Sequence, residues 1–422
     1  MPTLKGVNYL RDKLNYKKNR VKLRYKYYEM KNIVRDLNIS TPPDLRFWMG
    51  VLGWCSRAVD SLADRLVFRE FENDNFGMNE IFNLNNRDIL IDSAILGSLI
   101  TSCDFIYITA DDDGYPRMRV IDGSHATGII DPITNMLTEG YAVIDFDDRD
   151  NALTEAYFIP GHTVIYQGGR IMADIPNAAP YPLLVPMINR PDAKRPFGHS
   201  RISRACMSIV NSAIRTVKRS EIAAEFFSYP QKYILGMNSD SEAMDKWKAT
   251  MSSMLRIDKD EDGDRPVVGQ FQAASMAPHS EQLRMFAGLF AGETGLTLDD
   301  LGFPSQNPSS AEAIKASHES LRLIARKAQH TFGTGLINAG YLAACVRDNT
   351  PYLRSEIYNT RVMWEPIFEP DAATLSAIGD GAIKINQAVP GFFDHAVLRS
   401  ITGIEGGEAP ENIFSINIEG EE

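Results

Sequence analysis

The chain has 422 residues, of which 44% are hydrophobic and 23% charged, and its formal net charge is −11. This length exceeds one compact core and predicts two to four structural units. The negative charge argues against a protein that coats nucleic acid by bulk attraction. The sequence contains no run of ~18 apolar residues, so we predict no membrane-spanning helix. The basic, polar N-terminus predicts no secretory signal.

The four cysteines lie far apart and form no CxxC pair; they are Cys55, Cys103, Cys206 and Cys345. We therefore expect neither a disulfide framework nor a zinc site. The same cysteine pattern indicates a reducing compartment.

Positive charge is concentrated in two stretches. Residues 5–31 contain ten Lys/Arg and two acidic residues, and residues 193–220 contain seven Lys/Arg and no Asp or Glu. The first stretch lies in a helical arm predicted over residues 1–38, which also carries several tyrosines. Two interpretations of this arm stay open. It either packs on its own domain with a solvated outer face, or it contacts nucleic acid or a protein partner.

Residues 45–168 change from helical to strand-like patterning. Pro42-Pro43 ends the arm, and an apolar helix is predicted over residues 45–68. Short β-branched and aromatic runs separated by turn residues predict an antiparallel sheet over residues 89–168, including a hairpin between 157–160 and 164–167. Six prolines in residues 176–196 predict an extended connector.

A helix is predicted from about Ser200 to Phe227, because Pro230 stops it. At 100° per residue, five cations fall within an arc of ~100°; they are Arg201, Arg204, Arg215, Lys218 and Arg219. Apolar residues occupy the opposite side. The face is either solvated or meets an anion such as DNA phosphate. Like charges at helical spacing cost stability, which favours the anion.

Residues 231–272 predict a small unit made of a strand (232–235), a helix (241–255), an acidic turn and a strand (266–271). A second helix is predicted over 278–293, followed by a Gly/Pro/Asn-rich loop over 295–308. Ser309 and Glu312 have capping-box spacing, and they open a helical stretch over 310–346 in which Gly333 and Gly335 are expected to produce a kink. A strand (361–368) and two helices split at Pro390-Gly391 follow.

Reaction motifs are missing. The sequence has no Walker loop, HExxH, GxSxG or Rossmann glycine pattern, and its seven histidines are scattered singly. We therefore expect no catalytic activity and no cofactor. Asp258, Asp260, Asp262 and Gly263 match the start of a calcium loop, but its twelfth position is Gly269 instead of Glu. This segment is interpreted as an acidic surface turn without metal.

Several stretches together resemble the portal proteins of siphophages, the head–tail connectors of tailed bacteriophages. The order and spacing of these stretches carry the resemblance over about residues 35–403. They are PDLRFW (43–48) through WCSRAVDSLADR (54–65), PMINR (186–190), FGHSRI (197–202), SYPQKYILG (228–236), and LTLDDLGFP (296–304) running into NPSSAEAI (307–314).

The resemblance implies an α+β portal fold. Its parts are a wing of N-terminal helices and antiparallel sheet (residues 1–196), a first stem helix (197–227), a small α/β clip (228–272) and a second stem helix (273–294). A tunnel loop (295–308), a long wing helix with a return strand (309–370) and a short helical crown or C-terminal tail (371–422) follow.

The resemblance also implies a function without catalysis. Twelve copies would form a ring at one capsid vertex of the virion, after assembly in the host cytoplasm, and the ring would be the channel for genome packaging and ejection. Implied partners are double-stranded DNA, the terminase large subunit, head–tail adaptor proteins and the major capsid protein, with no membrane. The alternatives are another virion structural protein, such as a minor head protein with nucleic-acid affinity, or an enzyme with an unrecognised site.

Candidate site residues follow from this layout. The five cations of the first stem helix would form the basic DNA-channel face. Tunnel-loop contacts would come from Asp299, Asp300, Phe303, Gln306 and Asn307, and partner docking at the clip from Trp247, Asp258, Asp260 and Asp262.

Overall fold

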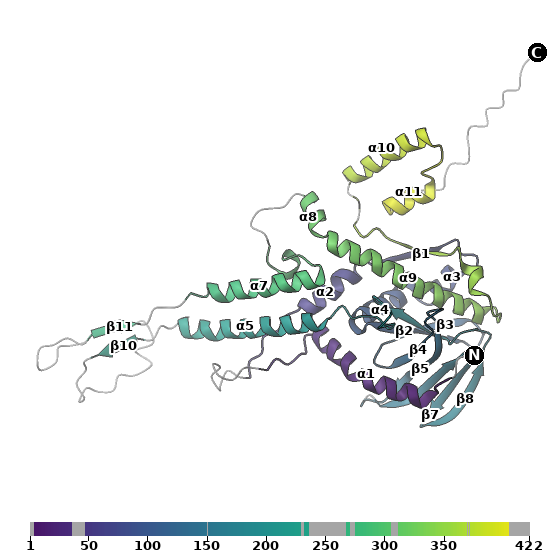
Figure 1. Ribbon diagram of the computed structural model, residues 1–422, viewed down its shortest axis with the longest axis horizontal. Coiled ribbons are helices and arrows are strands. Elements are labelled where there is room, and N and C mark those ends of the chain that lie inside the picture. Colours follow the sequence, from purple (N-terminus) through teal and green to yellow (C-terminus); the bar gives the residue numbers. More distant parts are fainter. Residues whose placement is uncertain are drawn as a thin grey trace, which may run out of the picture. The chain divides into compact units, whose positions relative to one another are not determined.

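The computed structural model describes residues 4–35, 47–149, 151–228, 232–235, 267–270, 275–304, 311–368, 370 and 372–404. The chain divides into two compact units (Figure 1). Unit 1 comprises Met1–Glu29, Ser56–Ser203 and Ser309–Glu422, and unit 2 comprises Met30–Cys55 and Arg204–Pro308. Helices and strands both contribute, as the predicted α+β class requires. Across these described ranges, no helix is long and apolar enough to cross a membrane.

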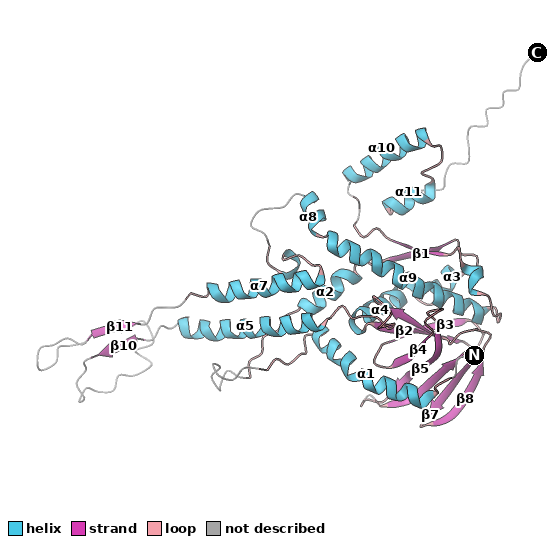
Figure 2. Ribbon diagram, in the orientation of Figure 1, coloured by secondary structure: helices cyan, strands magenta, loops and turns pink. Residues whose placement is uncertain are grey.

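Two antiparallel sheets form the centre of unit 1 (Figure 2). The first has the order β3-β2-β9 and the second the order β4-β5-β6-β7-β8. Their strands are β2 (Cys103–Ala110), β3 (Pro116–Ile121), β4 (Ala126–Ile130), β5 (Leu137–Phe146), β6 (Ala152–Ile159), β7 (His162–Gln167), β8 (Arg170–Pro176) and β9 (Leu184–Ile188). The predicted antiparallel sheet and the β6–β7 hairpin are confirmed. The proline-rich connector is extended, and its β9 segment pairs with β2.

The predicted start of the sheet at residue 89 is wrong. Residues there belong to α4 (Arg87–Thr101), which follows α3 (Met78–Leu84). Ile91, Ala94, Ile95 and Leu99 are buried with the spacing of one helix face. The β-branched residues suggested strands, but a period near 3.6 decides the structure.

The predicted helix over residues 45–68 is too long. Only α2 (Trp54–Ala63) is helical among the described residues of this range, and β1 (Phe68–Glu72) pairs antiparallel with β12 (Arg361–Trp364). Phe68 lies opposite Trp364 in this register, with ring centroids 6.2 Å apart. A partner almost 300 residues away therefore determines the strand.

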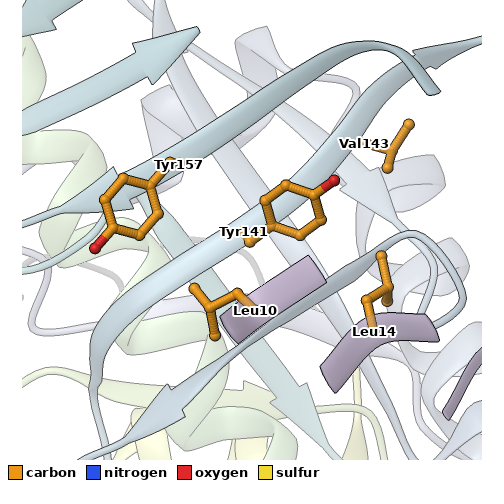
Figure 3. Packing of buried hydrophobic residues seen from close by; sticks show 5 residues of the cluster. All are labelled: Leu10, Leu14, Tyr141, Val143 and Tyr157. Carbon is orange, nitrogen blue, oxygen red and sulfur yellow. The ribbon is translucent and has the colours of Figure 1, made fainter. Parts of the chain in front are cut away.

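Helix α1 (Val7–Tyr28) packs on the five-stranded sheet, which confirms a helical N-terminal arm. Leu10 and Leu14 are buried against Tyr141, Val143 and Tyr157 (Figure 3). This cluster fixes one face of α1 to the strands β5 and β6.

The long helical stretch is interrupted at His318, between α8 (Ala311–Ser317) and α9 (Glu319–Arg347). Gly333 and Gly335 both lie inside α9 and do not interrupt it, and the expected kink stays a prediction. A Cβ at Gly335 would lie 2.6 Å from the Met187 sulfur, so this glycine permits close packing of α9 on β9. Of the predicted capping box, Ser309 lies outside the described residues.

The C-terminal part of unit 1 follows the predicted order. The 3₁₀ helix η3 (Arg354–Ile357) precedes β12, which is shorter than the predicted strand. Helices α10 (Ala372–Ala388) and α11 (His395–Thr402) are separated at Pro390-Gly391, as predicted. The Asp394 carboxylate caps α11 by accepting from the Val397 N–H at 2.8 Å.

Unit 2 contains α5 (Arg204–Ser228), the strand pair β10 (Lys232–Leu235) and β11 (Val267–Gln270), α7 (Ala277–Thr294) and the 3₁₀ helix η2 (Asp299–Leu301). β10 and β11 pair antiparallel, and they confirm the two predicted strands. The second predicted helix corresponds to α7. The helix predicted over 241–255 lies outside the described residues.

Candidate functional site

Helices α5 and α7 pack side by side in unit 2 (Figure 1). The Thr216 hydroxyl donates to the Gln282 side-chain oxygen at 3.0 Å, and Trp54 and Phe290 lie 5.7 Å apart between ring centroids. The apolar side of α5 is closed by this packing, since Cys206, Val210 and Ala213 are each 1% exposed or less. These positions are therefore buried within a single subunit.

The predicted cations on α5 differ in exposure. Arg204 and Arg219 are exposed, Arg215 is half-buried and Lys218 is only 6% exposed. The Arg215 guanidinium donates to the Ser212 hydroxyl at 3.1 Å. The structure therefore does not present the cations of α5 as one uniform solvated face.

Residues outside α5 cover the middle of its cationic side. Arg215 and Lys218 line a cavity of about 10 Å³ together with Asn32, Val34, Trp48, Met49, Gly50 and Ile214. A space of this size holds at most one water molecule. Asn32 also donates to the Asn211 side chain at 3.3 Å. An anion as large as a phosphate would have to displace this segment to reach Lys218.

Arg201 lies before α5 and belongs to unit 1, so its assignment to the helix face is corrected. Its backbone N–H donates to the Leu99 carbonyl at 2.8 Å, and its Nε donates to the Ala58 carbonyl at 3.1 Å. The residue is 8% exposed. The turn before α5 is tied to α4, and this delays the helix start to Arg204.

The described part of the predicted tunnel loop is a packed turn. Gly295 ends α7 in the left-handed conformation, with φ at 70°. The Asp300 carboxylate accepts from the Thr297 N–H and hydroxyl, both at 2.9 Å, and these bonds close the turn that leads into η2. Asp299 is exposed, Phe303 is half-buried, and its N–H donates to the Leu298 carbonyl at 3.0 Å. Gln306 and Asn307 lie outside the described residues.

The clip can be described only through β10 and β11, in which Lys232 lies opposite Gln270 and Leu235 opposite Val267. The predicted docking residues lie outside the described residues; they are Trp247, Asp258, Asp260 and Asp262. The acidic turn considered as a calcium loop lies outside them as well.

The cations of α1 are directed largely into unit 1. Arg11 pairs with Glu155, the Lys13 ammonium donates to the Gly128 carbonyl at 2.6 Å, and the Lys17 ammonium lies 5.3 Å from the Phe105 ring centroid. Burial lowers the pKa of Lys17 to about 8. Arg24 donates to the Thr101 carbonyl. Of the two interpretations of the arm, these contacts favour packing on its own domain.

Two acidic side chains that the sequence reasoning missed hold α1 in place. The Glu139 carboxylate is 1% exposed and accepts from the N–H groups of Lys5 and Gly6 at 2.7 and 2.9 Å and from the Tyr157 hydroxyl at 2.8 Å. Glu155 accepts from Arg11 and from the Tyr141 hydroxyl. The alternation of side-chain direction along β5 and β6 is the one sequence signal that could have indicated that Glu139 and Glu155 face inward. That alternation does not indicate which groups the two carboxylates bind.

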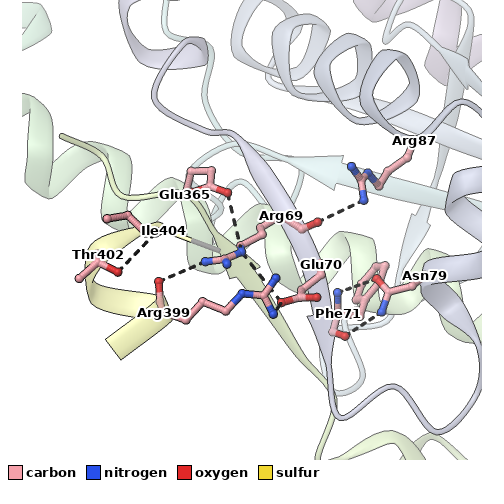
Figure 4. Close-up of polar contacts among 9 residues, drawn as sticks. All are labelled: Arg69, Glu70, Phe71, Asn79, Arg87, Glu365, Arg399, Thr402 and Ile404. Atoms are coloured by element: carbon pink, nitrogen blue, oxygen red, sulfur yellow. Dashed lines mark hydrogen bonds and ion pairs between the residues drawn. The ribbon is translucent and has the colours of Figure 1, made fainter. Parts of the chain in front are cut away.

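A second missed group fastens α11 to β1 and β12 (Figure 4). Arg69, which is 8% exposed, lies 3.8 Å from a Glu365 carboxylate oxygen and donates to the Arg399 carbonyl at 3.2 Å. The Arg399 guanidinium lies 3.5 Å from Glu70. Sequence separations of some 300 residues left no local signal for this cluster.

Reactive groups are not assembled in the described structure. Burial raises the pKa of the Cys55 and Cys103 thiols above the ordinary value. It raises the pKa of the Cys345 thiol to about 11. All three thiols therefore stay protonated and poorly nucleophilic. Within the described ranges, no group of three or more His, Cys, Asp or Glu side chains could hold a metal ion.

Comparison with known proteins gives a consistent family. The chain is 23% identical over 384 residues to the portal protein of Mycobacterium phage L5, which covers 85% of this chain and 77% of the relative. It is also 23% identical over 381 residues to the portal protein of Mycobacterium phage D29, with the same coverage. No family model matches the chain.

Among solved structures, the chain is similar to a chain in the virion of a native gene transfer agent particle, with a TM-score of 0.44. It is also similar to a chain in the neck of that particle, computed with C12 symmetry, with a TM-score of 0.46. Both alignments have 13% identity and cover 84% of this chain and 90% of the other. The two portal-protein relatives confirm the resemblance predicted from the sequence motifs: over 85% of its length, this chain is similar to the portal proteins of two mycobacteriophages.

Proposed function

We propose that copies of this chain form a ring of twelve at one capsid vertex, through which the genome enters and leaves the virion. The observation that carries the proposal is the homology to two phage portal proteins over 85% of the chain. Portal proteins are structural proteins, in keeping with the expectation that this chain is not an enzyme. The alternative of a different minor head protein is not favoured, because both relatives are portal proteins.

Exposed apolar side chains in unit 2 support assembly. Met285 and Leu289, one turn apart on α7, are 53% and 55% exposed, and Phe47 and Val51 are 82% and 61% exposed. Apolar surface of this kind normally marks a protein contact. In a closed ring of identical subunits, each copy would cover this surface through a heterologous contact with its neighbour.

The exposed cations of α5 support DNA contact at two heights. Arg204 and Arg219 are separated by 15 residues, or about 22 Å along the helix axis. Repeated around a ring axis, they would give two circles of positive charge on an otherwise acidic molecule. Few phosphate contacts release few counterions, so DNA would be guided without being held tightly. Arg215 and Lys218 contribute to this surface only if residues 47–50 move away.

Docking of the terminase large subunit and head–tail adaptor is proposed at the segment between β10 and β11. Deleting residues 247–264 is expected to leave units 1 and 2 folded and to abolish DNA packaging. Packaging by such a deletion variant would contradict this assignment. The contact with the major capsid protein is proposed for unit 1, which corresponds to most of the implied wing.

Mass photometry and negative-stain microscopy of the purified chain test the ring directly. Twelve copies of 47.1 kDa give a particle of about 565 kDa with a central hole. Stable folded monomer over the whole micromolar range would contradict the proposal. An ATPase assay with and without DNA should show no activity in the chain alone.

A further inference from the structure

The outer edge of β8 differs from the outer edges of β3, β9 and β4. At β3, the Asn85 side chain accepts from the Met118 N–H at 2.9 Å and donates to the Pro116 carbonyl at 3.0 Å. At β9, the Ser98 hydroxyl donates to the Met187 carbonyl at 2.8 Å. At β4, Lys13 donates to the Gly128 carbonyl. In each case a helix supplies a side chain that satisfies the edge.

β8 is the last strand of the five-stranded sheet, and the structure pairs it with β7 alone. Its large apolar residues are exposed: Ile171 by 65%, Met172 by 69% and Ile175 by 46%. Proteins usually protect such an edge with lysine, internal proline or a covering element. Here the strand carries two charged residues, Arg170 and Asp174, but no lysine, and Pro176 is its last residue. Its pairing with β7 has one register shift, between Ile165 and Tyr166. A long apolar edge of this kind is a template for another strand.

The exposed residues lie on both faces of the sheet. Ile171 lies opposite Tyr166, which packs against the cluster under α1, whereas Ile175 lies opposite Thr163 on the other face. A strand added beside β8 would therefore need apolar residues that continue both faces. It would also satisfy the outer N–H and C=O groups of β8 through main-chain hydrogen bonds.

The sequence contains such a segment outside the described residues. In Asn412-Ile-Phe-Ser-Ile-Asn-Ile-Glu419, Phe414, Ile416 and Ile418 alternate with polar residues, and Ile413 adds an apolar side chain on the opposite face. Pro410 precedes the segment, and Gly406-Gly407 lie between it and Ile404. The eight residue steps from Ile404 to Asn412 span at most about 29 Å when extended.

We propose that residues 412–419 of a neighbouring copy add a strand to the free edge of β8. The chain reaches Ile404 from α11, which Arg399 fastens to β1, and Figure 1 shows α11 and β8 on opposite sides of α9 within unit 1. A neighbour is therefore the donor. The assignment of the donor strand to a neighbouring copy rests on the proposed ring. The binding of residues 412–419 to β8 does not depend on that ring.

A peptide titration tests the recognition separately from ring assembly. A chain truncated after Ala409 is titrated with a fluorescent peptide of residues 411–420, and anisotropy reports binding. We expect saturable binding that weakens at least tenfold in the Ile171→Lys/Met172→Lys variant, because charges at an edge oppose strand addition. The matched control is Ile133→Lys, at an 88% exposed apolar residue elsewhere in unit 1, which should bind normally. A peptide carrying Phe414→Asp and Ile416→Asp should not bind.

No binding, or equal binding by the β8 lysine variant, would overturn the proposal. The donor is identified in the full chain with cysteines introduced at Asp174 and Asn417. Oxidation should give a ladder of covalent multimers on a denaturing gel, whereas a monomer with an internal cross-link would overturn the assignment to a neighbour. If the peptide binds but mass photometry finds no ring, the proposed function fails and the recognition stands.

Discussion

Helices α1 and α5 have similar sequences in one respect: each carries a dense set of cations. In the structure their cations have different roles. Those of α1 meet carboxylates, carbonyls and aromatic rings of the sheets beneath it, including Glu155, Gly128 and Phe105. On α5, Arg204 and Arg219 remain exposed while Lys218 is buried. A count of positive residues therefore does not identify a nucleic-acid surface; the acids and carbonyls supplied by distant strands decide it.

The largest expected stability effect is at Lys218 of α5, and its exposed neighbour Arg219 serves as the control. Lys218→Glu should destabilise unit 2 by about 4 kcal/mol, because a new negative charge replaces a buried ammonium. Arg219→Glu should change the free energy of unfolding by no more than about 0.5 kcal/mol, because this side chain is exposed. Urea denaturation of the two variants measures the difference. Equal losses of unfolding free energy would mean that Lys218 and Arg219 share one environment, which would contradict the difference in their burial.

A smaller effect is expected beneath α1. Glu139→Ala should cost about 3 kcal/mol, since it leaves two backbone N–H groups and the Tyr157 hydroxyl without their acceptor. Glu139→Gln should cost less, because the amide oxygen still accepts. Hydrogen exchange of residues 7–14, together with denaturation, checks this. Unchanged exchange in the alanine variant would show that α1 is held by its apolar face alone.

A pH dependence is expected in the polar layer under α1. Asp104 is 2% exposed, and burial raises its carboxyl pKa to about 8, above the unfolded value near 4. The folded state thus keeps a proton that the unfolded state releases, so the contribution of Asp104 to stability is fully present below pH ~4 and is lost as the pH rises towards 8. The slope is at most about 1.4 kcal/mol per pH unit. Asp104→Asn should flatten stability curves over this window, and an unchanged slope would contradict the protonated carboxyl.

Local patterns were sufficient where a segment's partner is near in sequence. The β6–β7 hairpin, the strands β10 and β11, and the helices α7, α10 and α11 were predicted from turns, breakers and periodicity. Prediction failed where distant contacts decide. β1 is a strand because β12 pairs with it, and Arg201 leaves the helix face because Ala58 and Leu99 accept its hydrogen bonds.

The candidate site shows the same limit. Helical periodicity placed Arg204, Arg215, Lys218 and Arg219 on one side of α5, but it could not show that Trp48, Met49 and Gly50 cover the middle of that side. The loop after α7 looked unstructured from its glycines and prolines. Its Thr297 and Asp300 instead hydrogen-bond to each other and close a turn. Predicting this contact required knowing that a 3₁₀ helix follows.

Counting subunits per purified prohead, together with packaged DNA, tests the central claim that the exposed cations of α5 line a DNA channel. Charge reversal at Arg204 and Arg219 should leave twelve copies per prohead and reduce packaged DNA at least tenfold. The matched control reverses two exposed cations of α1, Arg20 and Lys26, and should package normally. If proheads lack the α5 variant, the cations contact the capsid instead of the channel. If the α5 variant packages DNA normally, the channel assignment is contradicted.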